Sequence, residues 1–187
     1  YVDSYVFEES LLPHELVSAS LKKVRMKEEL MLSTKQFEQD RHIRDAIKFL
    51  TSDGINYMNE NLFKACSSEF SAIHDLLEQI DLNQEIPENL QKFFNLSNQV
   101  VQGIVDTALL KYKEADYQMT LSLFVMLSAL IPSNYDFWFR QGISAQMCGQ
   151  TDLALKAYAK ASELNPGDIV PRLFSIECQL EKGLLQE

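Results

Sequence analysis

The sequence contains little glycine and proline, with six and five residues among 187. Proteins rich in β-sheet need frequent turns built from these two residues, so their scarcity argues against a sheet and favours long helices. No apolar run reaches the roughly 20 residues that a membrane-spanning helix needs. We therefore expect an all-α protein with no membrane partner.

Cysteine is also scarce. Cys66, Cys148 and Cys178 are odd in number, and each lies within a helical pattern. This usage argues against a disulfide framework and is typical of buried thiols in a reducing compartment. The predicted location is the cytoplasm.

Positive charge is in the minority, with 17 basic against 27 acidic residues and a net charge of −10. Both halves of the chain are acidic, so we expect no nucleic-acid partner. An acidic surface that binds a basic or hydrophobic protein partner is compatible with this charge.

Motifs for catalysis are absent from the sequence. None of His14, His42 and His74 has a second ligand three or four residues away that makes a helical metal site convincing. The sequence has no glycine-rich phosphate loop and no nucleophile elbow. We expect a protein that is not an enzyme and that binds no metal and no cofactor.

The second half of the chain repeats with a period of 34 residues. Pro166 follows Pro132 at this distance, as Tyr158 follows Phe124 and Gly183 follows Gly149. This period is typical of tetratricopeptide repeats, in which two antiparallel helices form each unit. Residues 135–168 carry most of the pattern: Trp138, Gly142, Gly149, Ala154, Tyr158, Ala161 and Pro166. Gln141 and Ala145 depart from it, because Leu and Tyr are usual there.

The period predicts a tetratricopeptide-repeat domain over 97–187, in the form of a helical solenoid. Its repeats span 101–134, 135–168 and a partial unit at 169–187. The predicted helices are 101–115, 118–131, 135–148, 152–164 and 170–182. Gly142 and Ala154 are expected at the crossing of the two helices of their repeat, and Gly149 in the turn. The partial repeat either caps the solenoid or is continued by further chain.

Residues 1–96 lack this period and are predicted to form an N-terminal helical region. Its apolar residues have helical spacing, "TSDG" at 51–54 ends a helix, and Ser97 caps the first repeat helix. Two alternatives remain for this region. It packs on the solenoid, or it forms a self-association arm that produces a homodimer.

The first helix of each tetratricopeptide repeat lines a concave groove. The repeat register therefore predicts a peptide-binding groove that is mainly apolar, with methionine and aromatic side chains that adapt to shape. The candidate groove residues are Val105, Leu109, Tyr112, Phe139, Ile143, Gln146, Met147, Leu173, Glu177 and Leu180.

The segments "FWFRQGISAQMCGQTDLALKAYAKA" (137–161) and "PRLFSIECQLEKGLLQE" (171–187) resemble class II chaperones of bacterial type III secretion, a virulence system. The resemblance covers about residues 95–187. It implies a cytoplasmic chaperone whose groove holds an extended hydrophobic segment of a secreted translocator or effector and keeps it soluble. The roughly 100 residues before the first repeat exceed the family's usual short lead. The alternative function is a tetratricopeptide-repeat scaffold that joins folded protein partners.

Overall fold

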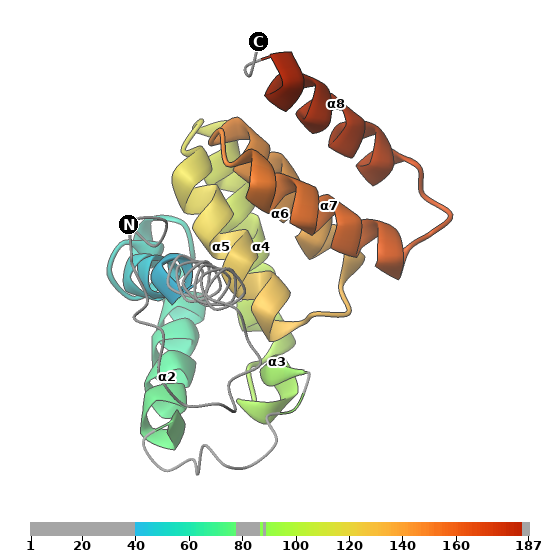
Figure 1. The fold of residues 1–187 in the computed structure, drawn as a ribbon. Coiled ribbons are helices and arrows are strands. Elements are labelled where there is room, and N and C mark those ends of the chain that lie inside the picture. The colour runs from blue at the N-terminus through green and yellow to red at the C-terminus, as the bar shows by residue number, and fades with distance from the viewer. Residues whose placement is uncertain (1–39, 78–86, 88, 185–187) are drawn as a thin grey trace, which may run out of the picture. The chain divides into compact units, whose positions relative to one another are not determined.

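The computed structural model describes residues 40–77, 87 and 89–184 (Figure 1). The chain divides into two compact units, residues 1–41 and 42–187, and the account below concerns the second. The helices predicted before residue 40 lie outside the described residues. Within the described ranges every regular element is a helix. The first elements are a helix that includes residues 42–52, a 3-10 turn η1 (Gly54–Asn56), α2 (Glu60–Leu77) and α3 (Leu90–Phe93).

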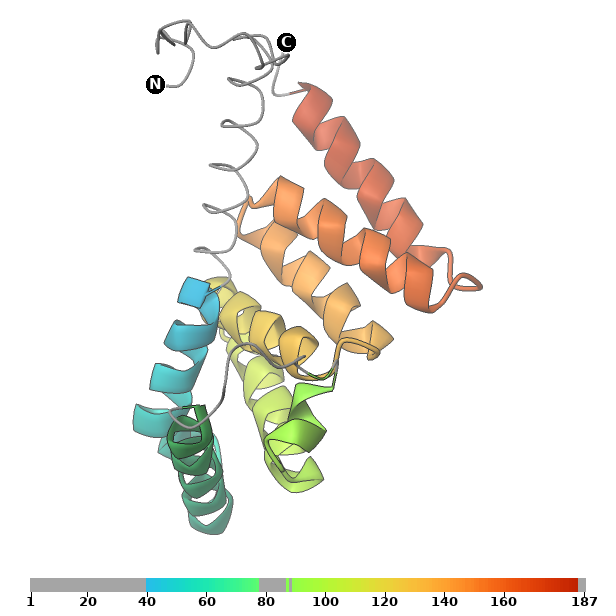
Figure 2. The same ribbon diagram turned by 60° about the horizontal axis from the view of Figure 1, so that its bottom comes forward.

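Five further helices follow one another as a stack in chain order (Figure 2). They are α4 (Asn98–Lys113), α5 (Tyr117–Leu130), α6 (Tyr135–Met147), α7 (Thr151–Leu164) and α8 (Val170–Leu184). Helices α5 and α7 begin and end 34 residues apart, as the period predicts. Each helix packs on the next one along the chain. The prediction of an all-α helical solenoid is confirmed.

Polar side chains fix the starts of three solenoid helices. Ser97 accepts a hydrogen bond from the backbone N–H of Val100, as the sequence predicts. Asp116 and Asn134 cap α5 and α6 in the same way. Because the first N–H groups of a helix have no partner within it, such caps contribute about 1 kcal/mol each.

The turns inside the two helix pairs have the same backbone conformation. Gly149 has a φ of 70°, and Ala115, 34 residues earlier, has a φ of 61°. In both turns the third residue after the helix donates its N–H to a carbonyl five residues back: Asp116 to Lys111 and Gln150 to Ala145. This left-handed helix ending suits glycine and strains alanine.

The core runs through the stack as two joined clusters. Leu123, Phe124 and Leu127 of α5 belong to the first cluster, which extends toward the N-terminal side. Leu121 and Val125 of the same helix belong to the second, with side chains of α6, α7 and α8. Helix α5 therefore contributes to both clusters and is buried along most of its length.

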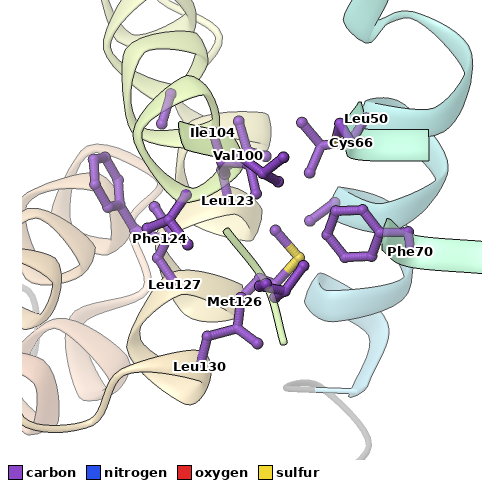
Figure 3. Close-up of a cluster of buried hydrophobic side chains, with 14 of the residues drawn as sticks. Leu50, Cys66, Phe70, Val100, Ile104, Leu123, Phe124, Met126, Leu127 and Leu130 are labelled. Carbon is purple, nitrogen blue, oxygen red and sulfur yellow. The ribbon is translucent and has the colours of Figure 1, made fainter. Parts of the chain in front are cut away.

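Residues 42–77 pack on the first helix pair. Leu50, Cys66 and Phe70 face Val100 and Ile104 of α4, and Leu123 and Met126 of α5 lie in the same cluster (Figure 3). Gly103 lets α2 approach α4 closely, since a Cβ there would lie 2.6 Å from a methyl carbon of Leu62. This part of the N-terminal region thus extends the core of the solenoid.

Two departures from the repeat pattern are explained by packing. Gln141, which replaces the usual leucine, is buried and accepts a hydrogen bond of 2.6 Å from the hydroxyl of Ser128 on α5. Ala145, which replaces a tyrosine, is fully buried in the second core cluster. The α5–α6 contact therefore contains a satisfied polar pair where an apolar side chain is usual.

The paired turns make a stability prediction. Ala115→Gly relieves the left-handed strain at residue 115 and should raise the free energy of unfolding by about 0.5–1 kcal/mol. Gly149→Ala should lower it by a similar amount, because no atom lies within 4 Å of the added methyl group and only the backbone conformation matters. Urea unfolding followed by circular dichroism measures both. Changes of the same sign would contradict a shared turn conformation.

Candidate functional site

Three of the candidate groove residues line one pocket. Leu109 and Tyr112 of α4 meet Ile143 of α6 there, and Phe124 of α5 lies in the same lining. The pocket has a volume of about 130 Å³. An apolar cavity of about 150 Å³ holds a benzene molecule, so this pocket has room for one medium-sized apolar side chain.

Arg140 and Ser144 complete the pocket lining. The Nε of Arg140 donates to the carboxylate of Asp136, one turn earlier on α6, at 2.6 Å. The hydroxyl of Ser144 donates to the backbone carbonyl of Arg140. The terminal nitrogens of the guanidinium group thus remain as donors beside an otherwise apolar pocket.

Phe139 is half-buried and belongs to an aromatic cluster within the fold. Its ring lies 6.0 Å from Tyr158 of α7 and 5.6 Å from Phe174 of α8, measured between centroids. It also stacks on Tyr135, whose hydroxyl donates to Asp168 just before α8. This cluster fastens α8 to the two helices before it.

Tyr158 lies at the centre of that cluster and is fully buried. Gly142 faces it so closely that an added Cβ would lie 2.4 Å from a ring carbon. This agrees with the expected position of Gly142 at the helix crossing. Burial raises the pKa of Tyr158, so the hydroxyl stays neutral and donates to the side chain of Gln146 at 2.9 Å. The amide of Gln146 therefore has a structural partner.

The remaining candidate residues do not line the pocket. Val105 is partly buried against the first core cluster. Met147 ends α6 with 49% of its surface exposed, and Leu173 and Leu180 of α8 are 56% and 63% exposed. Glu177 is exposed on α8. These side chains are accessible to a partner, whereas Phe139 and Gln146 are engaged within the fold.

The pocket also contains residues that the repeat register missed. Arg140 was overlooked because the groove template skips its position, although Asp136, Arg140 and Ile143 have the spacing of one helix face. The repeat period matches Phe124 with Tyr158 and gives it no place in the groove. In the structure it lines the pocket together with Leu109 and Ile143.

The described ranges contain no candidate metal cluster and no candidate membrane span. No group of three or more His, Cys, Asp or Glu side chains is placed there to hold a metal ion. None of the helices within those ranges is long and apolar enough to cross a membrane.

The fold and the pocket define a helical-repeat protein with an apolar binding pocket between successive repeats. No family model matches the chain, and no curated protein matches it. Among solved structures, a chain of the CopN–Scc3 complex is similar, with a TM-score of 0.52 and 22% sequence identity. The match covers 74% of this chain and 79% of the other. At this identity the similarity concerns the fold, so the two chains share a helical fold over most of their lengths.

The close contact between Gly142 and Tyr158 at the crossing of α6 and α7 predicts the effect of a substitution on stability. Gly142→Ala places a methyl group against the buried ring of Tyr158, and we expect the free energy of unfolding to fall by about 1–3 kcal/mol. Gly183→Ala on α8 is the matched control, because an added Cβ there meets no atom within 4 Å. Thermal melting should show a clear loss for the first variant and none for the second. Equal melting temperatures would place Gly142 away from the crossing.

Proposed function

We propose that this protein is a cytoplasmic chaperone that binds an extended apolar segment of a secreted protein and keeps it soluble until export. It acts by binding alone and not as an enzyme. The bound segment is a translocator-like hydrophobic stretch, held along the side of the solenoid formed by α4, α6 and α8. We call this side the A face.

The pocket of Leu109, Tyr112, Phe124 and Ile143 is the observation that carries the proposal. It lies between the first helices of two successive pairs, where tetratricopeptide proteins bind peptides. Such a pocket suits one apolar anchor residue, and affinity in peptide complexes comes mainly from a few anchors. Tyr112 of the lining is 37% exposed, and Met147 of α6, 49% exposed, offers further apolar surface on the same helix as Ile143.

The backbone of a bound segment also needs hydrogen-bond partners. An extended segment leaves its N–H and C=O groups unpaired, and these remain costly unless water or protein groups satisfy them. The guanidinium group of Arg140 is held by Asp136 beside the pocket and supplies donors for a carbonyl of the segment. Arg140 therefore positions the segment, and the pocket selects its anchor.

The structural similarity supports this choice of function. The CopN–Scc3 complex holds a chaperone with a secreted protein, and the shared fold spans most of both chains. The third repeat carries the run from Pro171 to Leu185 on which the family resemblance rests. Together these observations favour a chaperone over a scaffold for folded partners.

Selection from random twelve-residue peptides displayed on phage tests the proposal, with the full chain as bait. We expect the selected pool to be enriched in Leu, Ile, Met and Phe. Fluorescence anisotropy of a selected synthetic peptide should show at least about a tenfold weaker affinity for the double variant Leu109→Ala, Tyr112→Ala, because two anchor contacts are lost.

The control for this experiment is Leu110→Ala. Leu110 neighbours Leu109 in sequence, is 41% exposed and does not line the pocket, so its removal should leave binding intact. Melting curves must show that the double variant is still folded. A pool without apolar enrichment, or a folded double variant with unchanged affinity, would remove the basis of the proposed function.

A further inference from the structure

The exposed side of α8 carries two acidic side chains that have no partner within the described part of the chain. Glu177 and Glu181 lie one turn apart, and both are exposed. Neither takes part in an ion pair or side-chain hydrogen bond among the residues that the structure describes. Lys182, next to Glu181, pairs instead with Asp152 of α7 at 2.7 Å.

These two carboxylates continue a row that begins with an exposed apolar residue. Leu173, Glu177 and Glu181 are four residues apart, so their side chains follow one another along one side of α8. The neighbouring row contains Phe174 and Cys178, which pack inward on α7. Phe174 also touches Phe139 of α6, so the exposed row borders the A face.

Glu177 and Glu181 act on the aromatic cluster through their charge. Both carboxylates contribute to the raised pKa of Tyr158, after the larger effects of burial and Cys178. Arg140, the basic residue of α6, is already paired with Asp136. Within the described part of the chain, Glu177 and Glu181 therefore leave negative charge unpaired on this side of α8.

From this charge pattern we infer that the segment bound on the A face carries lysine or arginine beside its apolar residues, and that Glu177 and Glu181 pair with it. The inference rests on the proposed function and adds the chemistry of the segment. An apolar contact with Leu173 and a charge contact with Glu177 lie one helical turn apart, so a single amphipathic stretch makes both. A neutral apolar segment would contact Leu173 and leave the charge of Glu177 without a partner.

The ion pairs of Glu177 and Glu181 contribute little to the binding affinity, but they favour one kind of apolar segment over another. Ion pairs between exposed side chains contribute little, because water screens the charges and side-chain freedom is lost. Loss of one pair should weaken binding about two- to fivefold. The apolar anchors determine whether a segment binds, and the acidic row determines which apolar segment is preferred.

The same phage selection tests this inference when it is run against two baits, the wild type and the double variant Glu177→Gln, Glu181→Gln. We expect lysine and arginine to be enriched in the wild-type pool and this enrichment to disappear with the variant. Apolar enrichment should persist in both pools. Glu60→Gln with Glu163→Gln changes the net charge equally at glutamates that pair with Lys64 and Lys160, and should keep the basic enrichment.

A double-mutant cycle measures the coupling between the lysine of the peptide and the two glutamates. A selected basic peptide and its Lys→Gln counterpart should differ two- to fivefold in affinity for the wild type and bind the Glu177→Gln, Glu181→Gln variant equally. Pools that are apolar but not basic, or a lysine effect that survives in the variant, would overturn the inference while the proposed function stands. Pools without apolar enrichment would overturn both.

Discussion

The last three helices of the solenoid depend on the ring of Tyr158. This side chain of α7 is fully buried, lies over the bare backbone of Gly142 on α6 and touches Phe174 on α8. Its hydroxyl must also find a partner, because burial raises its pKa and keeps the proton in place. Gln146 provides that partner one turn beyond Gly142. The ring of Tyr158 thus sets the spacing between α6 and α7 and positions α8 against them.

The A face therefore contains residues that belong to the framework around Tyr158 and residues that are available for binding. Phe139 and Gln146 belong to the framework around Tyr158, so their loss would change the fold before it changed binding. Leu109, Tyr112 and Ile143 line a pocket at the α4–α6 junction, and no residue of α7 belongs to its lining. The binding surface can therefore vary at the pocket and along α8, while the centre of the solenoid stays fixed.

The solenoid was predictable because its period is strict and each repeat position has one physical role. The turn at Gly149, the cap at Ser97 and the position of Gly142 all followed from residue type and offset. The groove residues were less predictable, since a template gives the helix face but not what the next helix covers: Phe139 is partly covered by Phe174, 35 residues later. The left-handed backbone of Ala115 could not be predicted from its residue type, because alanine disfavours it. Residues 42–77 have no repeat, so their packing on α4 could be offered only as one of two alternatives.

Helix α8 is less buried than α5. It packs on α7 and on Phe139, while Ile176 and Leu180 on its other side are more than half exposed. In a solenoid each unit is stabilised by its neighbours, so a helix that packs on one side among the described residues opens at a lower free energy than one buried on both sides. The amide hydrogens of α8 should therefore exchange with solvent sooner than those of α5, which belongs to both core clusters. Any molecule that bridges α6 and α8 would slow this exchange, so the end of the solenoid would report whether the A face is occupied.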